Sequence, residues 1–170
     1  MVEENKFIET VNITEDDSVV KKMIERGNGN KPTEGQQIQV HYEGRLEDGT
    51  VFDCSYDREP LDVAIGTGAV IKGWDLGIMA MEFGEKAELW IKSEYGYGES
   101  GSPPKIPGGA TLIFTCELIK QMSDAERSEA ALAAKEKGNA EFKNKSWDSA
   151  ENYYSEAVEH LDAISADLTQ

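Results

Sequence analysis

The sequence contains few of the residues that covalent or metal-based sites require. Its 170 residues include only two cysteines and two histidines. Cys54 and Cys116 fit neither a disulfide scaffold nor the spacing of metal ligands, and His41 and His160 lie in separate segments. We therefore expect no catalytic triad, no metal site and no cofactor. The scarcity of cysteine favours a reducing compartment, the cytoplasm, with the nucleus as the alternative.

Basic residues and long apolar runs are also scarce. The chain has 17 Lys and Arg against 33 Asp and Glu, a formal net charge of −16. Nucleic acids and anionic membranes attract clustered positive charge, so neither is expected as a partner. No stretch approaches the roughly 18 consecutive apolar residues of a transmembrane helix. The first residues, MVEENKF, also lack the basic start and apolar run of a secretory signal.

The negative charge is concentrated at the two ends of the chain. Residues 1–17 carry one Lys against six acids, and residues 123–170 carry five basic residues against eleven acids. Residues 18–122 hold eleven against sixteen. This distribution predicts an acidic tail at 1–17, a compact domain at 18–121 and a separate region at 122–170.

The central segment contains both strand and helix patterns. Apolar and polar residues alternate over Gln36–Glu43, and again around Ala87–Lys92 and Thr111–Lys120. Between them, Gly73 to about Ala80 has helical spacing. We therefore predict an α+β fold in which a curved antiparallel sheet wraps around one short helix.

Aromatic residues from separated elements could face one interior. Each falls on the apolar side of its predicted element or in an adjoining loop: Tyr42, Phe52, Trp74, Tyr97 and Phe114. Such residues are either ordinary core or the walls of a ligand pocket. His41 falls on the polar face of its strand and is expected to be exposed, whereas Cys116 falls on the apolar face and is expected to be buried.

Four motifs in constant order carry a family resemblance. They are VHYEGRLEDGTVFDCSYDR (Val40–Arg58), VIKGWDLG (Val70–Gly77), YGYG (Tyr95–Gly98) and IPGGATLIFTCEL (Ile106–Leu118). On these residues the chain resembles the FKBP-type immunophilins over residues 18–121. The resemblance implies a peptidyl-prolyl cis-trans isomerase that acts on X–Pro bonds in peptides and folding proteins. It also implies that the macrolides tacrolimus and rapamycin bind in the same pocket.

This reaction requires little covalent chemistry. Rotation about an X–Pro amide crosses a barrier of ~18–20 kcal/mol because the planar amide loses resonance. No bond breaks, so no nucleophile or metal is needed. The reaction does need a dry apolar cavity that favours the twisted amide, and donors placed for the displaced carbonyl.

The resemblance assigns roles in the pocket. Trp74 would form the floor beneath the proline ring, with Tyr42, Phe52 and Phe114 as walls and Val70 and Ile71 at the entrance. The Ile71 backbone amide and the Tyr97 hydroxyl would donate to ligand carbonyls.

Asp53 would lie at the edge of the pocket. A carboxylate among aromatic rings needs partners to stay ionised, and the Arg58 guanidinium and the Tyr42 hydroxyl are the expected ones. The residues predicted to be catalytic are Asp53, Tyr97, Ile71, Trp74 and Phe52.

Some positions depart from the family pattern. Leu61 stands where most members have phenylalanine, and the loop from Arg58 to Pro60 is one residue shorter than in the smallest members. Ser102 and Lys105 replace the histidine and isoleucine of the prototype in the loop that overhangs the pocket. These changes leave an alternative function open: a chaperone-docking adaptor whose pocket binds ligand with little turnover.

The C-terminal region predicts two antiparallel helices. Asp124–Lys143 and Trp147–Ala163 are rich in Ala, Glu and Lys, with a break at Lys145-Ser146. Four residues at spacings of 12, 4 and 3 resemble a tetratricopeptide repeat: Gly138, Ala150, Tyr154 and Ala157. Only one repeat fits, and about three are needed for stability, so we expect a fragment of a longer protein or a loosely ordered end.

The repeat resemblance implies a co-chaperone role. Such repeats in larger immunophilins bind the acidic C-terminal tail of heat-shock protein 90. Lys135 and Asn139 match two positions of the clamp that holds this tail. They are four residues apart, so they share one helix face. A single repeat is also expected to leave an apolar stripe of Phe142, Trp147 and Tyr154 without cover.

Overall fold

The computed structural model describes residues 6–120 and 124–167. The chain divides into two compact units, one ending at Lys120 and the other beginning at Gln121. Within the described residues, no helix has the length and apolar character needed to cross a membrane. We describe each unit by itself.

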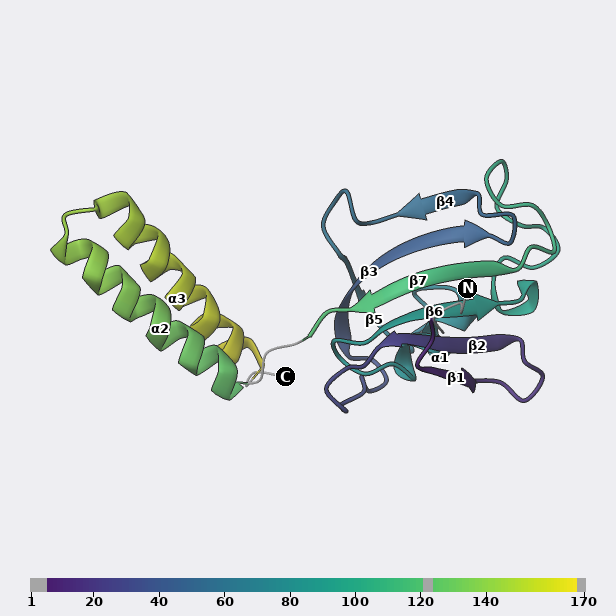
Figure 1. Ribbon diagram of the computed structural model, residues 1–170, viewed down its shortest axis with the longest axis horizontal. Helices are drawn as coiled ribbons and strands as arrows, with labels where there is room; N and C mark the ends of the chain where they lie inside the picture. Colours follow the sequence, from purple (N-terminus) through teal and green to yellow (C-terminus); the bar gives the residue numbers. More distant parts are fainter. Residues whose placement is uncertain (1–5, 121–123, 168–170) are drawn as a thin grey trace, which may run out of the picture. The chain divides into compact units, whose positions relative to one another are not determined.

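The first unit is a seven-stranded antiparallel sheet with one short helix (Figure 1). Its strands follow the order β1-β2-β6-β7-β3-β4, and β5 also pairs with β3. The elements are β1 (Glu9–Asn12), β2 (Val19–Glu25), β3 (Gln37–Leu46), β4 (Val51–Cys54), β5 (Leu61–Ala64), α1 (Lys72–Met79), β6 (Lys86–Ile91), the 3-10 turn η1 (Ser93–Tyr95) and β7 (Leu112–Leu118). The predicted α+β fold is confirmed for this unit.

The helix α1 packs directly on the sheet because small residues face it. A Cβ atom added to Gly73 would lie 2.4 Å from the Ile91 side chain, and one added to Gly77 would lie 2.8 Å from Leu89. Trp74 and Ile78 of the same helix are buried in the core. The two glycines therefore allow α1 to approach β6 closely enough to hold Trp74 in the interior.

Part of the segment predicted to be an acidic tail, residues 1–17, belongs to the sheet. Residues 9–12 form β1, which pairs with β2 from Glu9 opposite Met23 to Asn12 opposite Val20. Lys6 also forms an ion pair with the buried Glu88 of β6. The residues ETVN show no strand pattern because β1 is a short edge strand whose side chains are mostly exposed.

The second unit is a helical hairpin. Its helices are α2 (Asp124–Lys143) and α3 (Trp147–Asp167), so α3 runs further than predicted. Small buried residues bring the helices together: Ala131, Ala134, Gly138, Ala150 and Ala157. A Cβ atom at Gly138 would lie 2.6 Å from the Tyr154 ring, so this position needs glycine for the contact.

Candidate functional site

The sheet and α1 enclose a cavity of about 670 Å³. Its walls come from β3, β4, β5, the start of α1, the loop after η1 and β7. The lining residues are Tyr42, Phe52, Asp53, Leu61, Ala69, Val70, Ile71, Trp74, Tyr97, Ser102, Pro103, Pro104, Lys105, Ile106 and Phe114. The structure thus brings together every residue predicted for the pocket except Arg58, which lies outside the lining and contacts Asp53 and Tyr42.

Four buried aromatic rings form the apolar part of the cavity. The Trp74 ring meets Tyr42 edge-on at 4.9 Å between centroids, and Phe114 at 5.2 Å. Phe114 in turn meets Phe52 at 5.5 Å and 87° between ring planes. Edge-to-face contacts fix the positions of the rings relative to one another. The cavity therefore has a rigid apolar interior with Trp74, only 3% exposed, at its base.

Gly44 of β3 makes room for two of these rings. A Cβ atom at this position would lie 2.6 Å from Phe52 and 2.7 Å from Phe114. Any larger residue would push both rings into the cavity. The pocket therefore depends on Gly44, which was not among the residues predicted for it, although it lies within the first of the four motifs.

Asp53 is held by three hydrogen bonds at the edge of the cavity. Its Oδ2 accepts a bond of 2.6 Å from the Tyr42 hydroxyl. Its Oδ1 accepts bonds from Arg58 Nη2 at 3.0 Å and from the Cys54 backbone N–H at 2.9 Å. Arg58 also donates to the Tyr42 hydroxyl at 3.0 Å. Asp53 thus has both of the partners expected from the sequence.

These contacts shift the pKa values of the two groups. Burial raises the pKa of Asp53, but the bonds from Tyr42, Arg58 and the Cys54 N–H outweigh it and hold the pKa below its usual value. Burial and then the bond to Asp53 raise the pKa of Tyr42 to about 12. At neutral pH the pocket edge therefore carries an ionised carboxylate and a neutral phenol.

The entrance to the cavity is set by the turn before α1. Asp75 accepts hydrogen bonds from the backbone N–H groups of Gly66 at 2.8 Å and Gly68 at 2.9 Å. Both glycines have positive φ, 79° and 78°, which places their N–H groups toward this carboxylate. Asp75 therefore anchors the loop that leads into Val70 and Ile71, a role that was not predicted from the sequence.

Ile71 offers a free donor at this entrance. It is the residue before α1, and its carbonyl accepts bonds from the N–H groups of Trp74 at 2.9 Å and Asp75 at 3.2 Å. Its own N–H has no acceptor among the residues that the structure describes. The N–H is therefore available to a carbonyl bound in the cavity.

The loop after η1 forms the opposite side of the opening. Tyr97, 41% exposed, lines the cavity, and its carbonyl accepts a bond from the Gly101 N–H at 3.1 Å. Ser102 and Ile106 exchange backbone hydrogen bonds of 2.8 and 3.0 Å. Lys105 donates from Nζ to the Phe52 carbonyl at 3.3 Å. The loop thus forms one wall of the pocket and adds the positive charge of Lys105 to its lining. Its lining residues Pro103, Pro104 and Ile106, like Ala69 of the opposite loop, were not among the residues predicted for the pocket.

The structure corrects the expectation for His41 and confirms the one for Cys116. His41 is half-buried: its Nδ1 lies 3.0 Å from Ser55 Oγ, and its ring stacks on Tyr56 at 5.1 Å. The polar face of β3 is covered here by the chain that follows β4, which strand alternation does not predict. Cys116 is fully buried, and this burial raises the pKa of its thiol.

Two further residues were predicted to bind a partner. Lys135 and Asn139 of α2 are both exposed. The Asn139 Oδ1 accepts a hydrogen bond of 2.7 Å from the Tyr154 hydroxyl, which links α2 to α3. In the described part of the chain, no group of three or more His, Cys, Asp or Glu side chains is placed to hold a metal ion.

Comparisons with known proteins match the first unit to one family. The profile of the FKBP-type peptidyl-prolyl cis-trans isomerase family matches residues 28–119. The chain is 58% identical over 86 residues to the peptidyl-prolyl cis-trans isomerase FKBP15-1 of Arabidopsis thaliana, which covers 50% of this chain and 56% of that protein. It is 53% identical over 103 residues to the FK506-binding protein 1A of Aspergillus fumigatus, covering 59% and 92%.

Solved structures give the same result. The crystal structure of AtFKBP13 matches with a TM-score of 0.57 and 40% identity, covering 61% of this chain and 93% of that one. The crystal structure of the three FKBP domains of wheat FKBP73 matches with a TM-score of 0.62 and 34% identity, covering 65% and 49%. This chain therefore spans nearly all of some relatives and about half of others.

Proposed function

Because this chain belongs to the FKBP-type peptidyl-prolyl cis-trans isomerase family, we propose that its aromatic pocket catalyses the cis-trans isomerisation of X–Pro bonds. Peptidyl-prolyl isomerases among its relatives are 56–58% identical to it over the matched residues. The substrates are proline-containing peptides and folding proteins. The observation that carries the proposal is the rigid aromatic cavity with an unpaired Ile71 N–H at its entrance, among the residues that the structure describes.

The geometry supports a catalytic role for each of five residues. The proline ring packs on Trp74 between the Tyr42 and Phe114 rings, which excludes water from the amide. A twisted amide has lost its resonance and is less polar, so a dry cavity favours it over the planar form. The Ile71 N–H and the Tyr97 hydroxyl donate to the carbonyls on either side. Asp53, fixed by Tyr42 and Arg58, supplies a fixed negative charge at the edge, and Phe52 forms the adjoining wall.

The same cavity is proposed to bind macrolides such as tacrolimus. The pipecolinyl ring of this drug resembles a proline ring, and Leu61 still supplies an apolar wall where most members have phenylalanine. The smaller side chain removes part of one contact surface, so we expect weaker binding than in a domain with phenylalanine at this position.

A protease-free assay on a short prolyl peptide tests the enzyme claim. We expect micromolar protein to accelerate isomerisation without added metal, and tacrolimus to inhibit it. An unchanged rate would remove the isomerase proposal. If tacrolimus binds but isomerisation of the peptide is not accelerated, the result would instead favour the alternative function. In that case the protein is a chaperone-docking adaptor whose pocket binds ligand with little turnover.

A partner role for the hairpin rests on α2. We propose that it is the first tetratricopeptide repeat of a cytoplasmic co-chaperone, in which Lys135 and Asn139 contribute to binding the acidic tail of heat-shock protein 90. Two observations support this proposal. Lys135 and Asn139 are both exposed on α2, and the hydrogen bond from the Tyr154 hydroxyl holds the Asn139 side chain in place. The test is whether a longer protein that carries all the repeats binds the tail peptide and loses this binding on Lys135→Ala.

A further inference from the structure

Ser55, the residue that follows β4, has a polar side chain that is completely buried. It is 0% exposed and is not part of the lining of the cavity. Burying a hydroxyl is unfavourable unless its hydrogen bonds are made within the protein. The partners of Ser55 therefore indicate why a polar residue lies here.

Ser55 binds both backbone groups of Tyr42. Its N–H donates to the Tyr42 carbonyl at 2.8 Å, and its Oγ accepts the Tyr42 N–H at 2.8 Å. The pairing of β3 with β5 ends at Val40, and its pairing with β4 begins only at Glu43. Tyr42 lies between the two pairings, so the Ser55 hydroxyl replaces the strand carbonyl that would otherwise accept its N–H.

Ser55 also positions the backbone of Arg58. Its carbonyl accepts the Arg58 N–H at 3.0 Å, which closes a turn of four residues. From the end of this turn the Arg58 side chain reaches back to Asp53 Oδ1 and to the Tyr42 hydroxyl, each at 3.0 Å. The two side chains that hold the Asp53 carboxylate therefore both start from backbone groups that bond to Ser55.

His41 fixes the orientation of the Ser55 hydroxyl. Its Nδ1 lies 3.0 Å from Ser55 Oγ, and its ring stacks on Tyr56 with 12° between the ring planes. Because Oγ already accepts the Tyr42 N–H, the Ser55 O–H is the group left to donate to Nδ1. The alternative acceptor, the Tyr42 carbonyl, is further away at 3.4 Å. The hydroxyl therefore both donates and accepts, which favours one orientation.

We propose that Ser55 is a positioning residue of the isomerase, which holds Tyr42 and Arg58 where they fix the Asp53 carboxylate at the edge of the pocket. This inference rests on the function proposed above, because it concerns the same pocket. Ser55 does not touch the substrate and acts only through these two neighbours. In the competing explanation Ser55 only fills a buried space, and its loss lowers stability without acting through Asp53.

Kinetics on a prolyl peptide test the proposal. Ser55→Ala removes the acceptor of the Tyr42 N–H, so we expect kcat/KM to fall about 5-fold. Ser55→Cys keeps the volume but supplies only a weak acceptor, so it should show the same fall and takes the place of Ser55→Ala if that variant does not fold. The matched control is Ser18→Ala, which truncates a buried serine of 4% exposure outside the pocket and should leave kcat/KM unchanged.

A double-mutant cycle separates positioning from a purely structural role. In an Asp53→Asn background no carboxylate remains to be positioned, so Ser55→Ala should lower kcat/KM by less than about 2-fold. A fall of about 5-fold in both backgrounds would mean that Ser55 acts independently of Asp53 and would overturn the proposal. Wild-type kcat/KM in Ser55→Ala would also overturn it.

A measurement that needs no turnover distinguishes failure of this inference from failure of the proposed function. Although burial raises the pKa of Asp53, the bonds from Tyr42 and Arg58 hold it below its usual value. NMR titration of the Asp53 carboxyl should therefore show its pKa raised toward that value in Ser55→Ala and unchanged in Ser18→Ala. An unchanged pKa in Ser55→Ala would overturn the positioning role even in an active isomerase. A raised pKa in a protein that does not accelerate isomerisation would support the positioning role and remove only the isomerase function.

Discussion

The Tyr42 hydroxyl donates a hydrogen bond of 2.6 Å to Asp53 Oδ2, and Arg58 binds both residues at 3.0 Å. This triangle joins β3, β4 and the loop that follows them at the edge of the aromatic pocket. It keeps a carboxylate ionised beside apolar rings and holds the Tyr42 ring edge-on to Trp74.

Replacing either polar group at the pocket should lower activity while the fold remains. Asp53→Val removes bonds to a charged acceptor, each worth ~1.5–3 kcal/mol, so we expect kcat/KM to fall about 10- to 100-fold. Tyr97→Phe removes one neutral donor and should cost about 2- to 10-fold. Thermal unfolding of both variants is the control. Wild-type activity in either variant would show that its role is misassigned.

Trp74→Ala should affect stability as well as activity. This side chain is only 3% exposed and contacts two other rings, and a large-to-small aromatic change of this kind costs ~3–5 kcal/mol. Urea unfolding measures the loss, and calorimetry with tacrolimus should detect no binding. A variant as stable as the wild type would mean that Trp74 is not part of the core.

We expect kcat/KM to be constant from about pH 5 to pH 9, because neither Asp53 nor Tyr42 changes its charge in this range. The folded pKa of Asp53 lies below its unfolded value, so its contribution to stability is complete above about pH 4 and is lost as the pH falls through the lower folded value. The pKa of Tyr42 is raised from 10.0 to about 12, so its contribution is present below pH 10 and is lost as the pH rises toward 12. A profile of kcat/KM against pH measures this. In wild type kcat/KM should fall at low pH, where Asp53 becomes protonated, and in Asp53→Asn this fall should disappear because residue 53 no longer titrates.

Lys105 should favour acidic substrates. It lines the pocket and donates to the Phe52 carbonyl, while Asp53 is already paired with Arg58. Its ammonium group can therefore pair with a substrate carboxylate next to the proline. In Lys105→Met, the ratio of kcat/KM for Glu–Pro over Gln–Pro peptides should fall by up to ~5-fold, and Lys143→Met on the hairpin should leave it unchanged. An unaltered ratio would exclude this role for Lys105.

The chain should bind the acidic tail of heat-shock protein 90 weakly or not at all. Lys135 and Asn139 can hold one carboxylate, and an exposed ion pair contributes only ~0–1 kcal/mol. The excess of acids on the hairpin further opposes an acidic peptide. Strong binding by these 170 residues, abolished by Lys135→Ala, would contradict the expectation.

Elements with regular periodicity could be predicted from the sequence. The alternation around Gln37–Leu46, Lys86–Ile91 and Leu112–Leu118 reveals β3, β6 and β7, and helical spacing reveals α1 to within a residue. The edge strand β1 and the four-residue strands β4 and β5 are too short or too exposed for periodicity to identify. Their position depends on pairing with strands distant in the sequence.

The pocket aromatics could be predicted because each lies on or beside a patterned element. For Lys105, the resemblance indicated the loop over the pocket, but its contact with the Phe52 carbonyl depends on the course of that irregular loop and has no periodicity that reveals it. The anchoring role of Asp75 likewise depends on the positive φ angles of Gly66 and Gly68, which bring two N–H groups to one carboxylate. Gly44 is recognised only once the positions of both rings are known.

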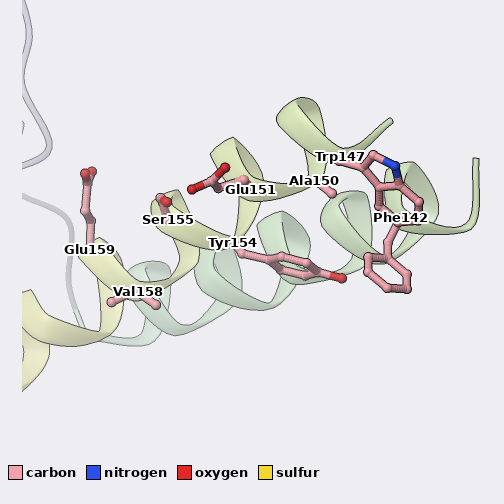
Figure 2. Close-up of a pocket in the computed structure, with 8 residues that line it drawn as sticks. All are labelled: Phe142, Trp147, Ala150, Glu151, Tyr154, Ser155, Val158 and Glu159. Atoms are coloured by element: carbon pink, nitrogen blue, oxygen red, sulfur yellow. The ribbon is translucent and has the colours of Figure 1, made fainter. Parts of the chain in front are cut away.

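The three tryptophans occupy three different environments, and this gives the protein a set of built-in optical probes. Trp74 is buried at the base of the pocket, Trp90 lies 3.9 Å beneath the Lys22 ammonium on the sheet, and Trp147 is 55% exposed on the hairpin (Figure 2). A buried indole emits at shorter wavelength than a solvated one. Proteins that retain one tryptophan at a time would therefore report pocket occupancy, sheet integrity and the environment of the hairpin as separate fluorescence signals.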